Sequence, residues 1–300
     1  MRPAFWHSTS VPARAIAGRN RATIPDVSES LLTCTVRGCG LRLDQGAHAW
    51  TYGAGHSYDV SRRGYVNLLQ PQDRRSSSPG DSKESLEARA RLLASGAGRS
   101  ILDAFVDQAA AVSVPPGSLV VELGAGGGDA LGGLHGRSAI AGVGIDLSTA
   151  AASMAARRYP GVTWVVANAD RGLPIATGGA ALVLSLHARR NATECARVLG
   201  AGHLLIAVPA ADDLIELRAA VMGDGVLRDR VDAVVAEHVP LFSLERRTTV
   251  RERRLLVREV LLDLLRATYR GVRTSGADQV RALDALEVTL SSDLLLFKRR

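Results

Sequence analysis

The sequence has few cysteines, and this scarcity excludes one class of protein. Cys34, Cys39 and Cys195 are the only cysteines among 300 residues. Three cysteines do not make the disulfide framework of a small secreted domain, and they fit a reducing compartment. Residues 1–20 contain scattered arginines but no apolar segment of the kind that a secretory signal needs. The sequence therefore predicts a cytoplasmic protein.

Long hydrophobic runs are absent as well. No window approaches the roughly 18 uninterrupted apolar residues that a membrane-spanning helix requires, so we expect no membrane partner. Hydrophobic residues make up 46% of the chain, which is an ordinary share for a soluble globular protein. A chain of 300 residues has room for one large α/β domain and a smaller one.

Lysine is nearly missing, because Lys83 and Lys298 are the only lysines and arginine supplies the remaining strong bases. The 37 basic residues exceed the 30 acidic ones and give a net charge of +7. Such an excess favours a polyanionic partner such as RNA, since bound phosphates release counterions. A GC-rich genome also produces an arginine-rich chain. The charge therefore supports RNA binding without establishing it.

A glycine-rich stretch follows the first strongly apolar segment of the central region. Residues 120–128 read Val-Val-Glu-Leu-Gly-Ala-Gly-Gly-Gly, the pattern of a buried strand that enters a tight turn before a helix. We expect Gly124, Gly126 and Gly127 to approach a nucleotide-like cofactor. A dinucleotide fingerprint needs a further glycine where Asp129 stands, which disfavours a nicotinamide dehydrogenase. Glu122, two residues before the first glycine, suits a cofactor with a positively charged end.

Further acidic residues stand where later strands are expected to end. The segment 142–146 reads as the next strand, and its last residue, Asp146, is placed to accept from two ribose hydroxyls. Together with the glycine turn, this pattern resembles the first two motifs of Rossmann-like methyltransferases that use S-adenosylmethionine. The resemblance implies that Asp170 lies near the adenine ring and that the loop containing Asp213 borders the cofactor. From its position alone, a plain surface turn is the alternative interpretation of Asp170.

The N-terminal part has a different character. Residues 1–30 lack periodicity and form either a disordered basic tail or the product of an upstream start codon. Residues 31–70 look like a zinc-ribbon-like β domain, with Cys34, Cys39 and His56 as candidate zinc ligands. Tyr52 occupies the place of a fourth ligand, so His48 or a water would have to complete the site. The ribbon is alternatively expected to fold by packing alone.

A linker is predicted over residues 71–85, which are rich in proline, glycine and serine. Ser82 or Asp81 is expected to cap the helix that follows. Four arginines flank this region and are candidate contacts to RNA phosphates if the linker crosses the mouth of the cofactor domain. They are Arg62, Arg63, Arg74 and Arg75.

The region around the linker carries the most specific resemblance. Residues 64–69 (Gly-Tyr-Val-Asn-Leu-Leu), 79–82 (Pro-Gly-Asp-Ser) and 88–89 (Ala-Arg) resemble the signature of the large-subunit ribosomal RNA guanine-N1 methyltransferases. That family includes the tylosin- and mycinamicin-resistance type. The chain departs from the family in its ribbon, where the spacing of the first cysteine pair is widened and Tyr52 matches a cysteine.

The resemblance implies a function. It predicts methylation of guanine N1 in a hairpin of 23S ribosomal RNA by S-adenosylmethionine, with a role in macrolide resistance. His187 stands where the family has an aromatic residue, and it is expected either to stack on or hydrogen-bond the guanine or simply to pack. No residue is assigned as the general base. The alternatives are a small-molecule methyltransferase and a noncatalytic RNA-binding protein on the same scaffold; whether a homodimer forms stays open.

We therefore predict an α/β fold with a Rossmann-like class I methyltransferase sheet over residues 86–300 and a small N-terminal β domain. Cys195 is expected to be a small buried residue within a helix. A strongly apolar helix is predicted over residues 253–269, between two final strands at 242–250 and 286–297.

Overall fold

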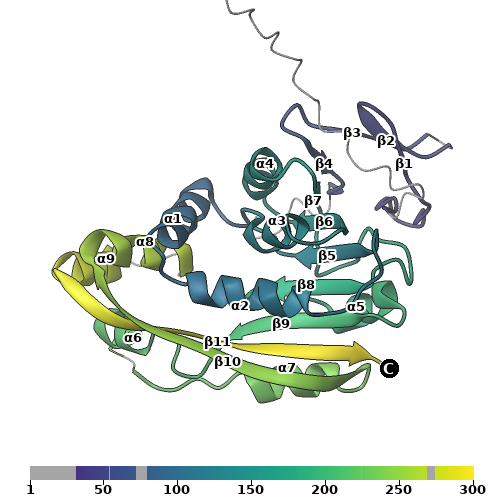
Figure 1. Ribbon diagram of the computed structural model, residues 1–300. Helices are drawn as coiled ribbons and strands as arrows, with labels where there is room; N and C mark the ends of the chain where they lie inside the picture. The colour runs from purple at the N-terminus through teal and green to yellow at the C-terminus, as the bar shows by residue number, and fades with distance from the viewer. Residues whose placement is uncertain (1–31, 54, 72–79, 224, 269–273) are drawn as a thin grey trace, which may run out of the picture.

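The computed structural model describes residues 32–53, 55–71, 80–223, 225–268 and 274–300. An eight-stranded mixed sheet runs through the molecule, and a small three-stranded sheet lies at its N-terminal end (Figure 1). The tail predicted over residues 1–30 lies outside the described residues, as does segment 72–79 of the predicted linker.

The large sheet has the strand order β10-β11-β9-β8-β5-β6-β7-β4. Its strands are β4 (Tyr65–Asn67), β5 (Leu119–Leu123), β6 (Ala141–Asp146), β7 (Thr163–Val166), β8 (Leu182–Leu186), β9 (His203–Pro209), β10 (Phe242–Val257) and β11 (Ala285–Arg299). The strands from β4 to β9 pair in parallel, so their carboxyl ends share one edge. The chain moves outward from β5 in one direction through β6 and β7, and in the other through β8 and β9. Ligands of open α/β sheets bind at such a switch point.

Helices cover both faces of this sheet. They are α1 (Lys83–Ala94), α2 (Arg99–Ala110), α3 (Asp129–His135), α4 (Thr149–Arg158), α5 (Ala192–Leu199), α6 (Ile215–Met222), α7 (Val231–His238), α8 (Arg258–Thr268) and α9 (Thr274–Arg281). One face packs on α2, α3 and α4, where Phe105 and Trp164 are fully buried. The other face packs on α5 and α7. Burial of Phe105 alone contributes about 1.5–3 kcal/mol.

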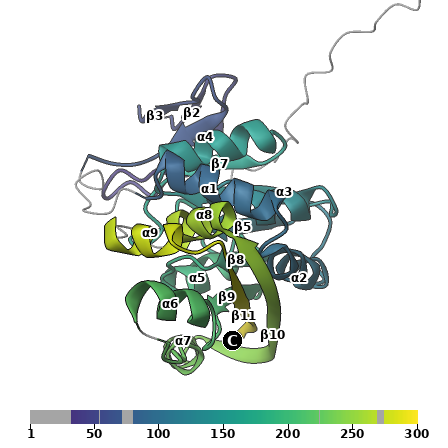
Figure 2. The same ribbon diagram turned by 90° about the vertical axis from the view of Figure 1, so that its left-hand side faces the viewer.

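Helices α1 and α8 lie side by side at one end of the sheet (Figures 1 and 2). Arg91 of α1 donates two hydrogen bonds, of 2.8 and 2.7 Å, to the carboxylate of Asp263 in α8. Ser82 caps α1, since its hydroxyl accepts from the backbone N–H of Ser85. Of the two residues predicted to cap this helix, Ser82 is therefore the one that does.

The small β domain is confirmed as an antiparallel sheet of β1 (Asp44–Gln45), β2 (Ala49–Thr51) and β3 (Ser57–Asp59). Its apolar side chains, among them Leu43 and Trp50, join the same core that packs under α5 and α7. Strand β4, which follows in the chain, pairs with β7 at the edge of the large sheet. The N-terminal segment is therefore anchored to the large domain through both packing and strand pairing.

One predicted element is wrong in part. The helix expected over residues 253–269 begins only at Arg258, because residues 253–257 continue β10 and pair with β11. The apolar residues Leu255 and Val257 are exposed there, whereas Leu256 is buried. Exposure thus alternates with the period of a strand, and the long partner strand β11 determines the outcome. Residue 269, the predicted end of the helix, lies outside the described residues.

Candidate functional site

The glycine turn forms the floor of a cavity at the switch point of the sheet. Gly124 (φ +62°), Gly126 (φ +53°) and Gly128 (φ +81°) all have left-handed backbone conformations, and α3 begins directly after them. Gly124 cannot be replaced by a residue with a side chain for two reasons. Its φ is positive, and an added Cβ would lie 2.5 Å from the Cβ of Ala188. The backbone of the turn is therefore bare, and Gly124, Gly126 and Gly127 line a cavity of about 680 Å³. This volume lies in the range of small-molecule sites.

Two carboxylates stand at the strand ends beside this turn. Glu122 of β5 is 3% exposed, and one of its oxygens accepts a 3.0 Å hydrogen bond from the N–H of Leu131. Asp146 ends β6, and its two oxygens accept 2.8 Å hydrogen bonds from the N–H groups of Gly126 and Ser148. Both residues line the cavity. Backbone donors thus hold both carboxylates in place before any ligand binds.

Burial makes both carboxylates reluctant to ionise. It raises the pKa of Glu122 to about 8, and the negative charges of Asp129 and Asp146 add to the effect. Burial also raises the pKa of Asp146, although its two backbone donors oppose the change. A positively charged ligand group beside Glu122 would favour the ionised carboxylate. The site is therefore electrostatically suited to the cationic end of a cofactor.

The remaining predicted cofactor residues line the same cavity. Asp170 lies in the turn after β7, and its carboxylate is 3.6 Å from the guanidinium of Arg189. Asp213 lies in the turn after β9 and accepts a 2.9 Å hydrogen bond from the N–H of Ser291. Partial burial raises the pKa of Asp213 to about 6. The structure thus brings all seven predicted cofactor residues to one cavity.

His187 follows β8 and also faces this cavity. Its backbone has φ +54°, an uncommon conformation for a residue with a side chain, and its Nε2 forms a 2.8 Å hydrogen bond with the Ser292 hydroxyl. The protein around the ring displaces water and, with the positive charge of Arg89, lowers the pKa of His187 to about 4. The imidazole is therefore neutral near pH 7 and is held at the cavity wall.

Sequence reasoning did not assign a role to Arg89 of α1. Its guanidinium donates to the Asp81 carboxylate at 3.0 Å and to the Ala267 carbonyl at 3.1 Å. It lies over the glycine turn, because a Cβ added to Gly126 would be 3.3 Å from Nη1. Arg89 and Asp81 both line the cavity. The end of the linker and α1 thus form part of the cavity wall. The Ala-Arg pair at residues 88–89 of the family signature was the feature of the sequence that could have indicated a role for Arg89.

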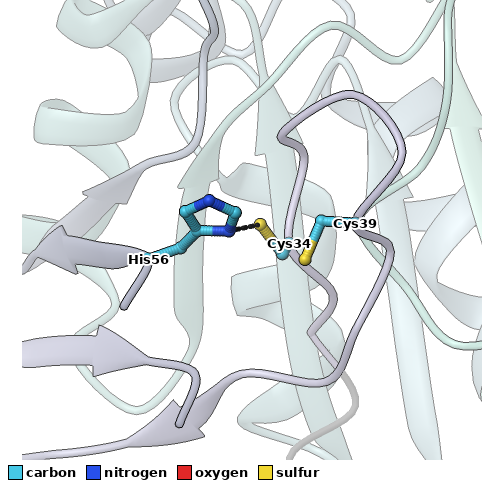
Figure 3. Close-up of side chains that lie close together, drawn as sticks. All are labelled: Cys34, Cys39 and His56. Carbon is cyan, nitrogen blue, oxygen red and sulfur yellow. Dashed lines mark hydrogen bonds between the residues drawn. The ribbon is translucent and has the colours of Figure 1, made fainter. Parts of the chain in front are cut away.

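Cys34, Cys39 and His56 come together in the small β domain, as predicted. Their ligand atoms all lie within 4.8 Å of one another, and Figure 3 shows the imidazole and the two sulfur atoms pointing toward a common region. The Sγ of Cys34 is 3.3 Å from Nδ1 of His56 and 3.1 Å from the hydroxyl of Tyr58. Two sulfurs and one imidazole are a donor set that suits zinc.

His48, which was predicted as a possible fourth ligand, is not part of this cluster among the described residues and is exposed. Tyr52 instead packs against the apolar core. The hydroxyl of Tyr58 is the polar side-chain atom beside Cys34 that the sequence did not single out.

Of the predicted RNA contacts that the structure describes, His187 lines the cavity, whereas Arg62 and Arg63 do not. Arg62 and Arg63 are exposed in the turn between β3 and β4, and Arg63 donates a 3.4 Å hydrogen bond to Ser153 of α4. Arg74 and Arg75 lie outside the described residues. No helix among the residues that the structure describes is long and apolar enough to cross a membrane.

Comparison with known proteins identifies relatives of the chain, although no protein-family model matches it. The chain is 35% identical over 207 residues to the 23S rRNA (guanine(748)-N(1))-methyltransferase of Streptomyces fradiae, covering 66% of this chain and 72% of the relative. It is 35% identical over 231 residues to a relative from Micromonospora griseorubida that is named for the same guanine-N1 activity, covering 71% and 76%. The protein YxjB of Bacillus subtilis, which is also named for guanine-N1 methylation of 23S rRNA, is 32% identical over 194 residues, covering 61% of this chain and 66% of YxjB.

Solved structures with a similar course of the chain have low identity. The YcgJ protein of Bacillus subtilis is 14% identical, with 66% of this chain and 97% of that chain covered and a TM-score of 0.49. A geranyl diphosphate C-methyltransferase of Streptomyces coelicolor is 17% identical, with 77% and 91% covered and a TM-score of 0.46. The identity and coverage of these sequence relatives show that this chain belongs to the 23S rRNA guanine-N1 methyltransferase family.

Proposed function

We propose that this protein transfers the methyl group of S-adenosylmethionine to N1 of a guanine in a hairpin of 23S ribosomal RNA. The observation that carries the proposal is the pair of carboxylates, Glu122 and Asp146, held by backbone donors at the switch point of the sheet. The substrate also requires a cytoplasmic enzyme.

The two carboxylates have separate tasks in this proposal. Glu122 accepts hydrogen bonds from the cofactor's ammonium group, whose charge offsets the cost of ionising a buried acid. Asp146 already accepts two backbone hydrogen bonds, but each carboxylate oxygen has a second lone pair for a ribose hydroxyl. When bound, S-adenosylmethionine supplies a methyl carbon attached to a positively charged sulfur. The protein then has to align the acceptor nitrogen with that carbon and exclude water.

The RNA contacts belong mainly to the N-terminal domain in this proposal. The target guanine must leave its stack to enter the cavity, which costs least in a hairpin loop. Exposed Arg62 and Arg63 contact phosphates and set the register of the RNA. A zinc ion held by Cys34, Cys39 and His56 keeps the ribbon in the shape that meets the hairpin.

Primer extension on 23S ribosomal RNA from cells with and without the gene tests the proposed function. Methylation at N1 blocks Watson–Crick pairing, so we expect a reverse-transcription stop at one guanine only when the gene is present. The purified protein should restore the stop on RNA from cells that lack the gene. Labelled methyl groups found only in small metabolites would instead indicate a small-molecule methyltransferase, and absence of transfer would indicate a noncatalytic RNA-binding protein.

We further propose that this methylation protects the ribosome against macrolides of the tylosin and mycinamicin type. The support is the resemblance of the linker signature to that resistance type. Expression in a sensitive host should raise the minimal inhibitory concentration of tylosin, and the Asp146→Ala variant should not raise it. If cells with and without the active gene are equally sensitive to tylosin, the methylation is a housekeeping modification and the resistance proposal is wrong.

A further inference from the structure

Asp213 and Arg218 are oppositely charged residues that line the cavity on a different wall from Glu122 and Asp146. Asp213 lies just before α6, and Arg218 lies within it. Both line the cavity, and the positive charge of Arg218 is one of the influences that lower the pKa of Asp213 against its partial burial. The two side chains are therefore electrostatic neighbours that face the same space.

Arg218 is unusual among the arginines of the cavity because it is only 6% exposed. Its Nη2 donates a long hydrogen bond of 3.4 Å to the Ala211 carbonyl, and its Nε has no partner among the described residues. No ion pair within 4.0 Å joins Arg218 to a carboxylate in the described part of the chain. A buried donor without an acceptor is costly, and this one borders a cavity that can hold a ligand.

Asp213 has an acceptor atom that forms no hydrogen bond to a described residue. Its Oδ1 accepts from the N–H of Ser291, while no hydrogen bond to a described residue engages Oδ2. Burial and the negative charge of Asp212 raise the pKa of Asp213 to about 6, against the hydrogen bond from the Ser291 N–H and the positive charges of Arg218 and Arg230. The carboxylate is thus ionised near pH 7, yet it is more basic than an exposed aspartate.

The sheet order assigns this wall to the methyl acceptor. The cofactor carboxylates stand on β5 and β6, whereas β8 and β9 lie on the opposite side of β5. His187 follows β8, and Asp213 follows β9. If the cofactor's sugar is held at Asp146 and its amino end at Glu122, the part of the cavity at the carboxyl ends of β8 and β9 is left for the second substrate.

We propose that Asp213 and Arg218 bind the N1–O6 edge of the target guanine, with Arg218 donating to O6 and Asp213 accepting the proton from N1. This inference rests on the proposed function. A donor and an acceptor that line the same space complement that edge, which presents the O6 acceptor next to the N1–H donor. A phosphate would meet the Arg218 guanidinium equally well, but the Asp213 carboxylate would repel it. Asp213 thereby has a substrate role in place of the cofactor contact expected from the sequence.

The pair supplies what guanine N1 needs in order to react. N1 is protonated near pH 7, so its lone pair becomes available when the N1–H proton moves to the Asp213 carboxylate. The negative charge that develops is shared with O6, where the Arg218 guanidinium stabilises it. N1 then forms a bond to the methyl carbon, and the bond between that carbon and the sulfonium sulfur breaks with its electron pair going to sulfur. Asp213 finally releases the proton to water.

The test compares Asp213→Asn and Arg218→Gln with the parent protein in single-turnover methylation of a 23S ribosomal RNA hairpin. We expect the rate to fall about 100- to 10,000-fold in Asp213→Asn, the range for loss of a general base. We expect a fall of about 100- to 1,000-fold in Arg218→Gln, with partial recovery in Arg218→Lys. Asp103→Asn, in an exposed ion pair on α2, is the matched control and should keep the parent rate.

Two further readouts separate this role from a structural one. Affinity for S-adenosylhomocysteine, measured by calorimetry, should be unchanged in Asp213→Asn, which also shows that the variant is folded. The parent kcat/KM should rise with pH through about 6, the pKa of Asp213, and the variant should lack that rise.

The outcomes distinguish this inference from the proposed function. If the parent methylates the hairpin and Asp213→Asn is equally fast, or if Asp213→Asn loses affinity for S-adenosylhomocysteine, the assignment of Asp213 is overturned. If Arg218→Gln keeps the parent rate, the assignment of Arg218 is overturned. A parent protein that binds the cofactor but does not methylate the RNA contradicts the proposed function, and the inference fails with it.

Discussion

The carboxylates of Glu122 and Asp146 and the cysteine–histidine cluster are two candidate sites in one chain, but they are built differently. Glu122 and Asp146 belong to buried parallel strands and are held by backbone N–H groups of neighbouring turns. Cys34, Cys39 and His56 belong to loops around strands of only two or three residues, and their cluster has three ligands. The fold itself pre-organises the first site, whereas the second needs a bound ion and a further ligand to become rigid.

The largest expected effect breaks the first site and spares the second. Asp146→Ala removes the acceptor of two backbone N–H groups and of the ribose hydroxyls, so affinity for S-adenosylhomocysteine should fall at least about 100-fold, or about 2.7 kcal/mol. Calorimetry measures this affinity, and zinc content and RNA binding should persist. Asp107→Ala, in an exposed ion pair, is the control. An unchanged affinity would place the sugar site elsewhere.

The reciprocal change breaks the second site and spares the first. Cys34→Ser removes a thiolate ligand. Loss of a residue that only hydrogen-bonds a metal ligand can lower affinity about 100-fold, so zinc affinity should fall at least about 100-fold here. Metal analysis of the purified protein and RNA-binding assays measure the loss, while affinity for S-adenosylhomocysteine stays at the parent value. Cys195→Ser changes a buried thiol away from the cluster and should keep the zinc. A metal-free parent protein that still binds RNA would contradict the zinc proposal.

A smaller effect concerns the charge state of Glu122. Its pKa is raised from 4.5 to about 8, so the folded protein holds an extra proton in that window and the free energy of unfolding should decrease as pH rises through it. The cofactor's ammonium group favours the ionised form, so affinity for S-adenosylhomocysteine should increase by up to about tenfold per pH unit until about pH 8. Calorimetric titrations from pH 6 to pH 8 measure this rise. A Glu122→Gln variant with the same pH dependence would show that another group is responsible.

The smallest effect concerns the exposed arginines of the ribbon. Replacing Arg62 and Arg63 by glutamate should weaken RNA binding and lower the slope of log K against log salt by about 0.7–0.9 for each phosphate that the protein no longer neutralises. Cofactor affinity should not change. The double replacement of Arg137 and Arg281 by glutamate makes the same change in net charge at exposed ion pairs and is the control. A salt slope equal to that of the parent would remove both arginines from the RNA-binding surface.

The contrast also explains what the sequence could predict. The sequence could predict that Glu122, Gly124 and Asp146 lie together, because a strand, a turn and the end of the next strand are local patterns with a fixed geometry. The pairing of Cys34 with Tyr58 was not found, because it depends on how two short strands lie across a loop. Arg218 was missed because its burial depends on how α6 packs beside β11, and an arginine in a helix has no distinguishing pattern.

The end of β10 illustrates the same limit. Residues 253–257 have the composition of the helix that follows them, and the partner strand β11, far along the chain, makes them a strand. Local propensity was overridden by pairing with a distant segment.

A crystal structure of the protein with S-adenosylhomocysteine would show where the cofactor lies. We expect both ribose hydroxyls within hydrogen-bonding distance of the Asp146 carboxylate, the amino group beside Glu122, and open space between the sulfur and Asp213. Electron density for the ligand elsewhere, or side chains that fill the space at the ends of β5 and β6, would contradict this expectation.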